Sequence, residues 1–335
     1  MFDFYKLNLQ LFAELNTNVT GDSGLSAENK TYYDMTLIDE AQANLVHDQF
    51  AQKRPIPKNG GKKIEFRKFA SLPKALTPLT EGVTPDGKKL SVTTLEAEVA
   101  QYGDYIVQSD VLELTSIDNT IVEATKILGR QAGLTLDTIT RNALQSGTNV
   151  FYAPKADGTA VTSREGLDNT CVLTVDLVNR VVAWLKKNNA PKINGDYVAI
   201  IHPYVAYDLM NDERWIDAHK YATPENIYNG ELGKIGGVRF IESSEAKVYE
   251  GGVFGCIFLA DGAYGVTEIT GGGLQTIIKQ KGSAGTADPL DQRSSIGWKA
   301  IKTAEILVEQ YVCRVECKSA LSVDFPAADK DLEAN

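Results

Sequence analysis

Few residues in this chain have the types and spacing that bind phosphate or activate a nucleophile. The run Gly271-Gly272-Gly273 has Thr276 where a dinucleotide fingerprint needs its third glycine, and no GxxxxGK sequence is present. Ser71 and Lys74 match the bare SxxK pattern of some acyl-transferring serines, but the companion KTG is missing and Ser71 lies among prolines. We therefore interpret the glycines as turn residues and Ser71 as non-catalytic.

The potential metal ligands are equally sparse. The histidines are His47, His202 and His219, with no HExxH motif, and Cys313 and Cys317 share one face of a strand. A zinc site usually takes its four ligands in close pairs, and Cys171 and Cys256 supply no second pair. We predict structural roles for these residues and a solvated surface for the many carboxylates. No catalytic, cofactor-binding or metal-binding residue is predicted, and the chain is not expected to be an enzyme.

The composition narrows the function classes further. The 335 residues carry 34 Lys+Arg against 44 Asp+Glu, a net charge of −10, whereas proteins that grip nucleic acid through phosphates need excess cations. Four cysteines are too few for a disulfide framework, and no run approaches the ~20 apolar residues of a membrane helix. The N-terminus lacks the basic start of a signal peptide. A globular protein of about two domains is expected, with reduced cysteines and no membrane contact.

The N-terminal region combines an apolar strip with a linker. The strip is either a frayed terminus or an arm that binds a partner surface, because an apolar strip is costly to leave in water. Its apolar residues are Phe2, Phe4, Leu7, Leu9, Leu11 and Phe12. A polar linker covers 17–30, and apolar steps of four or five predict a helix over 29–52, ended by Pro55 and Pro57.

Two half-polar strands, 63–69 and 92–101, flank a long segment rich in proline and glycine, 70–91. A lone hairpin is only marginally stable in water, so we expect this one to lie on the body or on another subunit, a mobile surface loop being the alternative. The predicted subunit-interface residues of the segment are Leu72, Leu76, Leu79, Glu81 and Val83, which join Phe2, Phe4, Leu9 and Phe12 of the N-terminal strip.

The remaining elements predict an α+β fold. Apolar or small residues at every third or fourth position indicate a helix over 118–146, roughly 40 Å long, with Gly147 just past its end. The second half alternates helices with strands, and a polar acidic tail ends the chain. Helices are expected at 175–188, behind Thr174, and from Pro203 through Leu209; strands at 197–202, 238–241, 256–259, 274–279 and within 297–321; and a loop at 282–295.

Short sequences along the chain resemble one protein family. They occur in this order: Leu79-Thr80-Glu81-Gly82, Tyr102-Gly103-Asp104-Tyr105, Gly230-Glu231-Leu232-Gly233, Gly236-Gly237-Val238-Arg239-Phe240, Asp288-Pro289-Leu290 and Gly297-Trp298-Lys299. Their order and spacing over about 41–318 resemble the major capsid proteins of tailed bacteriophages, in particular the coliphage N-four group, which have the Hong Kong 97-like fold.

The resemblance implies a division of the chain into the named parts of that fold. These are an N-terminal arm (1–30), a helix leading into the E-loop (31–59), the E-loop (60–101), the P-domain (102–166) with its spine helix (118–146), the A-domain (167–282), P-domain return strands (283–323) and an acidic tail (324–335). Only about thirty residues precede the first helix, so a separate scaffolding protein is expected. No motif identifies a partner for a covalent crosslink from Lys74, Lys88 or Lys89.

The implied function is a major capsid protein that self-assembles, as pentamers and hexamers, into the icosahedral shell around the double-stranded DNA of a tailed bacteriophage. The implied location is the virion, assembled in the cytoplasm of the host bacterium. Expected partners are further copies of the chain, a scaffolding protein, a portal protein and possible decoration proteins, with DNA enclosed but not bound sequence-specifically. The alternatives are an encapsulin-like bacterial nanocompartment shell and an α/β enzyme with its catalytic domain at 167–282.

Overall fold

The computed structural model describes most of the chain from residue 37 onward. The described residues are 37, 41, 45–57, 59, 61–69, 72, 74–79, 81–82, 84, 86–115, 120–220, 233–268, 271–283 and 288–321.

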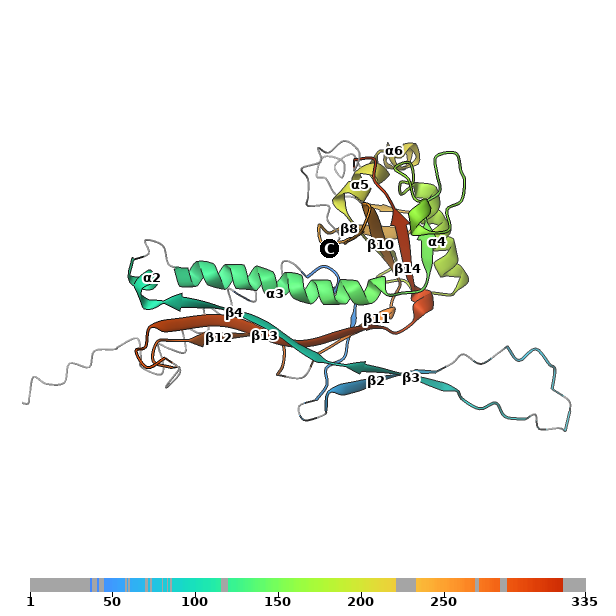
Figure 1. Cartoon of the computed structure of the whole chain (residues 1–335). Helices are drawn as coiled ribbons and strands as arrows, with labels where there is room; N and C mark the ends of the chain where they lie inside the picture. The colour runs from blue at the N-terminus through green and yellow to red at the C-terminus, as the bar shows by residue number, and fades with distance from the viewer. Residues whose placement is uncertain are drawn as a thin grey trace, which may run out of the picture.

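An elongated body is built from one long helix and a sheet (Figure 1). Helix α3 (Thr120–Gln145) lies along strands β4 (Ala100–Ser109) and β13 (Arg293–Ile306), which pair antiparallel over ten residues. The sheet is completed by β12 (Gln275–Lys279), β11 (Tyr264–Thr267) and β1 (Gln52–Lys53), and the short helix α2 (Asp110–Thr115) follows β4 at one end. The helix expected over 118–146 is confirmed.

The apolar stripe of α3 explains why the helix lies on this sheet. Leu128, Ala132 and Leu136 recur every fourth residue and are buried in one cluster with Trp298 and Ala300 of β13. Polar contacts then fix the register: the Trp298 indole donates to Gln131 Oε1 at 3.2 Å, and Gln131 Nε2 donates to Asp104 Oδ2 at 2.6 Å. The helix and both long strands are therefore one packed unit.

Residues 45–50, which precede β1, are held against α3 by buried contacts between polar and charged side chains. His47 Nδ1 lies 2.6 Å from Asp137 Oδ2, and both side chains are fully buried. Asp48 accepts hydrogen bonds from Thr140 Oγ1, at 2.5 Å, and from the ammonium of Lys302 on β13. We call these five residues the buried clamp. It joins three parts of the chain that are far apart in sequence.

A second sheet forms a separate lobe above one end of α3 (Figure 1). Its order is β5 (Val150–Tyr152), β14 (Val312–Cys317), β10 (Val253–Leu259), β6 (Tyr197–Ile201), β8 (Val238–Glu242) and β7 (Lys234–Ile235), with β9 (Lys247–Tyr249) also on β10. Every residue of β6 and β10 is buried. Helices α4 (Val175–Lys187), α5 (Pro203–Met210) and α6 (Glu213–Lys220) complete the lobe, with two 3-10 turns, η2 (Arg164–Gly166) and η4 (Glu309–Tyr311).

The expected helices and strands of this lobe are confirmed with small shifts of their ends. Thr174 caps α4 by accepting from the Leu177 N–H at 3.4 Å. His202 caps α5, where its Nδ1 accepts from the Tyr204 N–H at 3.2 Å and Pro203 occupies the first turn.

Three expectations about local structure were wrong. Of the helix predicted over 29–52, residues 37 and 41 are helical, but residues 47–50 form a turn and residues 52–53 form β1. The turn brings the backbone N–H and the ring of His47 to Asp137. The strand predicted over 92–101 is two strands, β3 (Val92–Glu98) and β4, which change partner at Val99. The loop predicted over 282–295 ends at Arg293, where β13 begins.

Hydrogen bonding also departs from the expected division of the chain. Strands β11 and β12, within the range expected for the A-domain, pair with β13 of the elongated body. Strand β14, within the range expected to return to the P-domain, pairs with β10 of the lobe. The chain therefore crosses between the two sheets more than once, and the contiguous ranges 167–282 and 283–323 do not correspond to separate sheets.

Candidate subunit interface

Strands β2 (Lys63–Phe69) and β3 pair antiparallel from Lys63 with Glu98 to Phe69 with Val92. We call β2, β3 and the connection between them the arm. Figure 1 shows it extending away from the body. The strand ranges expected from the sequence are confirmed for β2, and for β3 up to Glu98.

The base of the arm is anchored to the body. Phe66 and Ala97 are buried, and the Val99 N–H donates to the Lys62 carbonyl at 3.0 Å. The Phe66 ring lies so close to Gly265 of β11 that a Cβ on this glycine would be 3.2 Å from two ring carbons. The base is therefore packed on the sheet, and glycine at 265 is what allows the ring to approach.

The outer part of the arm leaves its apolar side chains in water. Leu72, Leu76 and Leu79 are 53%, 82% and 76% exposed, and Leu90 is also exposed. Fully burying one such leucine is worth about 1.5–3 kcal/mol relative to leaving it exposed. We call Leu72, Leu76 and Leu79 the arm tip. Several exposed large apolar side chains on one connection make it a candidate interaction site.

The described part of the chain contains some of the predicted interface residues and not others. Leu72, Leu76, Leu79 and Glu81 lie on the connection between β2 and β3, and Glu81 is exposed. The other predicted interface residues, Phe2, Phe4, Leu9, Phe12 and Val83, lie outside the described residues. The assignment of the arm tip to a subunit interface stays a prediction.

Sequence reasoning missed a second exposed apolar surface at the far end of the body. Tyr105 and Val107 lie on the outer face of β4, and Leu112 and Leu114 follow on α2. Leu290 is also exposed, and it lies two residues before Gln292, whose carbonyl accepts a hydrogen bond from the Asp110 N–H at 2.9 Å. We call Tyr105, Val107, Leu112, Leu114 and Leu290 the distal patch. The alternation of Tyr105 and Val107 was a usable indication, but which face is buried depends on α3.

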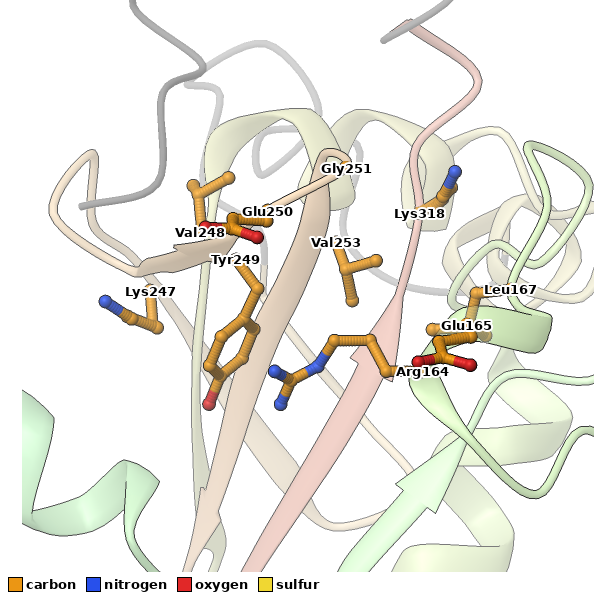
Figure 2. A pocket seen from close by; sticks show the side chains of 10 residues that line it. All are labelled: Arg164, Glu165, Leu167, Lys247, Val248, Tyr249, Glu250, Gly251, Val253 and Lys318. Carbon is orange, nitrogen blue, oxygen red and sulfur yellow. The ribbon is translucent and has the colours of Figure 1, made fainter.

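A cavity of about 540 Å³ in the lobe is one place where an enzyme site could lie. Figure 2 shows the Arg164 guanidinium turned toward the Tyr249 ring, while the amino group of Lys318 points away from it. The Lys247 ammonium lies 5.7 Å from the centroid of the same ring. Arg164 donates to both carboxylate oxygens of buried Glu316, at 2.8 and 2.6 Å, and its Cζ lies 3.6 Å from the Tyr249 ring centroid. The hydrogen bonds that Arg164 donates to the Glu316 carboxylate raise the pKa of Arg164. Arg164 is thus held between the Glu316 carboxylate and the Tyr249 ring.

The four cysteines and the two histidines His47 and His202 pack within the described part of the chain. All four cysteines are buried and free, and the Sγ atoms of Cys256 and Cys317 lie 3.9 Å apart. Burial lowers the pKa of His202 to about 4, so this capping ring is neutral at pH 7. Within the described part of the chain, no three His, Cys, Asp or Glu side chains are grouped as a metal site requires. No helix there is both long and apolar enough to cross a membrane.

A comparison with protein families decides the identity. The model of the phage capsid protein family matches residues 92–311, about two thirds of the chain. The chain belongs to the phage capsid protein family. No curated protein matches it. The match begins at β3 and includes α3, both long strands and most of the lobe. The capsid protein is thus a structural protein of the virion, a major capsid protein that assembles with further copies into a shell.

Solved structures show the same fold despite low sequence identity. The capsid protein of cyanophage Pam1 is 14% identical, with a TM-score of 0.66 over 84% of this chain and 92% of that one. The capsid of cyanophage P-SCSP1u is 13% identical, with a TM-score of 0.65 over 82% and 88%. The capsid protein therefore has the Hong Kong 97-like fold, as expected; its narrower assignment to the coliphage N-four group stays a prediction.

A lower score relates the chain to a virus-like particle from Pyrococcus furiosus. That protein is 11% identical, with a TM-score of 0.50 over 87% of this chain and all of the other. An encapsulin-like shell shares the architecture, but the family match and the higher TM-scores both favour a phage capsid. The nanocompartment alternative is therefore the weaker one.

Proposed function

We propose that the arm is the main assembly device of an icosahedral shell that encloses double-stranded DNA. The observation that carries this proposal is the contrast within the arm itself. Its base is packed against Gly265, whereas Leu76 and Leu79 at its tip are among the most exposed apolar side chains of the described residues. A surface that extends from the body and is left apolar is suited to bury itself on another subunit.

The energetics suit repeated, reversible contacts. Each leucine of the arm tip contributes about 1.5–3 kcal/mol on burial, before the costs of ordering are subtracted. Contacts of this size are weak enough to break when two copies meet wrongly. Repeated around a closed symmetric assembly, they are strong enough together to hold a shell. We propose that this assembly, in pentamers and hexamers, is the protein's activity and that it carries no catalysis.

We propose further partners on the grounds of charge and fold. The net charge of −10 suits a wall that encloses DNA without holding it, because a strongly cationic wall would bind DNA by counterion release. A tailed-phage shell also needs a portal protein, and we propose a separate scaffolding protein to direct closure. The N-terminal strip with Phe2 and Phe4 is proposed as a second contact between subunits.

The experiment that tests the proposed role of the arm replaces residues 76–83 by a Gly/Ser linker of equal length. Circular dichroism and solubility should stay near those of the parent, because Leu76 and Leu79 are exposed in the single chain. Shell formation, measured by sedimentation and electron microscopy, should fail or become irregular. A matched control carries Thr77→Ser and Thr80→Ser in the same segment and should assemble normally. Normal shells from the linker variant would refute the proposal.

A second measurement separates the phage shell from a nanocompartment. Particles purified from infected or expressing cells would be opened and their contents analysed for nucleic acid and protein. Double-stranded DNA, or a portal protein in the particle, supports the proposal. A stoichiometric enzyme cargo in particles without a portal supports the alternative instead.

A further inference from the structure

We infer that Cys256 and Cys317 form a redox-sensitive pair, which closes into a disulfide bond when the protein meets an oxidising low-molecular-weight disulfide. Their Sγ atoms lie 3.9 Å apart, and both side chains are buried in the lobe. The sulfurs of a disulfide bond are about 2.05 Å apart, so the two must approach each other by about 2 Å. This inference does not depend on the proposed role of the arm.

The register of β10 and β14 places the two cysteines on one face of the sheet. Phe254 lies opposite Cys317, and Cys256 lies opposite Val315. Residues two apart on a strand share a face, so Cys256 is the diagonal neighbour of Cys317 on that face. Cys317 is also the last residue of β14, where a shift of the backbone disturbs the fewest hydrogen bonds of the ladder.

The other two cysteines have different neighbours. The Cys171 thiol lies 3.4 Å from Asp168 Oδ1, and the Cys313 thiol lies 3.9 Å from a backbone carbonyl. The structure describes all four cysteines, and the two sulfurs in contact are those of Cys256 and Cys317. Oxidation should therefore select this pair.

The reaction is a thiol–disulfide exchange, with oxidised glutathione as the oxidant. One cysteine attacks a glutathione sulfur as the thiolate, the S–S bond of glutathione breaks, and one reduced glutathione leaves. The second cysteine attacks the resulting mixed disulfide, forms the bond between Cys256 and Cys317, and releases the second glutathione. The two cysteines lose two electrons in total, and the glutathione disulfide gains them as it becomes two thiols, which take up the two cysteine protons.

Burial makes this exchange slow in the folded subunit. The hydrogen bond with Cys256, together with burial, raises the pKa of the Cys317 thiol well above its ordinary value, and it is the thiolate that attacks a disulfide. The oxidant reaches the pair when the end of β14 opens locally. Intracellular thiol pools keep cysteines reduced, whereas a released virion has left those pools. The pair therefore stays reduced inside a cell and closes afterwards.

The bond would tie off the part of the chain that leaves the lobe. The two cysteines are 61 positions apart, and the segment between them carries β11, β12 and β13 of the elongated body. The bond closes this segment into a loop at the place where it leaves and re-enters the lobe. Because a closed loop restricts the unfolded chain more than the folded one, oxidation should raise the urea midpoint of the unassembled chain by roughly 1 M.

The test maps the bond in the parent chain. Assembled shells and the unassembled chain are incubated with oxidised glutathione at pH 8 and then unfolded with iodoacetamide, which alkylates every free thiol. Arg314 separates Cys313 from Cys317, so trypsin leaves the four cysteines on four different peptides. Mass spectrometry should find the peptide of Cys256 joined to that of Cys317, with Cys171 and Cys313 alkylated.

Serine variants connect the bond to the gain in stability. C256S and C317S should each lose the joined peptide and the rise in urea midpoint, whereas C313S, which changes another buried cysteine of β14, should keep both. The mapping in the parent decides the matter even where a variant fails to fold.

Three results would overturn the inference. The first is alkylation of all four cysteines after incubation with the oxidant, both in buffer and in urea below the unfolding midpoint. The second is a glutathione adduct that persists on Cys256 or Cys317, because the second thiol is then out of reach. The third is a joined peptide that contains Cys171 or Cys313.

Discussion

The arm and the seven-stranded sheet of the lobe are both built from strands, but they leave their apolar side chains in opposite environments. Strand β10 is buried along its whole length between β14, β6 and β9. Strand β3 has one buried residue, Ala97, one half-buried residue, and five exposed residues. The outer part of a two-stranded ribbon has no layer packed on its faces, whereas β10 packs in one apolar cluster on each face of its sheet.

The comparison explains how one chain serves both stability and assembly. The buried apolar clusters lie in the lobe and under α3, within the single subunit. The exposed leucines of the arm contribute nothing to that fold and become useful only when another copy covers them. Substitutions of the same chemical type should therefore act on folding in one region and on shell formation in the other.

The largest expected difference concerns ion pairs. Asp48→Ala leaves the Lys302 ammonium, 6% exposed, without its carboxylate, and should lower the free energy of unfolding of the unassembled chain by about 3–5 kcal/mol. Glu96→Ala breaks the exposed pair with Lys63 on the arm, 3.5 Å apart, and should cost less than about 1 kcal/mol. Urea unfolding of both variants checks this. Equal shifts of the two midpoints would mean that the buried clamp does not stabilise the body.

The next expected difference compares one substitution, leucine to alanine, at two positions. Leu185→Ala removes a fully buried side chain of α4 and should lower the free energy of unfolding by about 2–5 kcal/mol. Leu76→Ala on the arm should change it by less than about 0.5 kcal/mol. Leu76→Ala should lower the yield of shells, as measured by sedimentation. A large loss of subunit stability from Leu76→Ala would show that the arm folds back onto its own subunit.

A smaller effect is expected where the arm joins the body. Gly265→Val places side-chain atoms against the Phe66 ring and Leu307, and such overpacking typically costs about 1–3 kcal/mol. Because the strain falls on the contact that anchors the arm, limited proteolysis should cut within 63–98 faster than in the parent. Gly273→Ala, where a Cβ would meet only the Glu268 carboxylate at 3.5 Å and the backbone is not in the left-handed region, is the control for cutting elsewhere. An unchanged cleavage rate in the arm would show that the attachment of the arm to the body does not depend on Gly265.

The smallest effect is a pH dependence confined to the lobe. His202 has a pKa of about 4 in the folded chain and 6.5 ordinarily, because burial disfavours its charged form. The unfolded chain therefore binds the extra proton first, and folding stability falls as pH drops from 6.5 to 4. His202→Asn keeps a helix cap and should remove about 1–2 kcal/mol of that fall, allowing for partial exposure. The change in urea midpoint between pH 7.5 and pH 4.5, compared between the parent and the variant, measures this effect. An equal change in both proteins would contradict the attribution of the pH dependence to His202.

Elements with a strong local pattern were predictable from the sequence. Helix α3 was expected at 118–146 and lies at Thr120–Gln145, because its apolar residues follow the helical period over seven turns. Strand β2 alternates Ile64 and Phe66 with charged residues, and α4 has Thr174 as its cap. The exposed leucines of the arm were also foreseen, since proline and glycine on every side leave them no element of their own to bury against.

Contacts between distant residues were not predictable. His47 meets Asp137 across 90 positions, and Lys302 meets Asp48 across 254, so no short pattern could indicate either pair. The distal patch was missed for the same reason: α3 covers the face of β4 that carries Ile106 and leaves Tyr105 on the other. Likewise β14 belongs to the lobe because it pairs antiparallel with β10. The sequence by itself determined the helix, the hairpin and the family; the tertiary structure decided which apolar faces are covered, because burial depends on what the rest of the chain places against them.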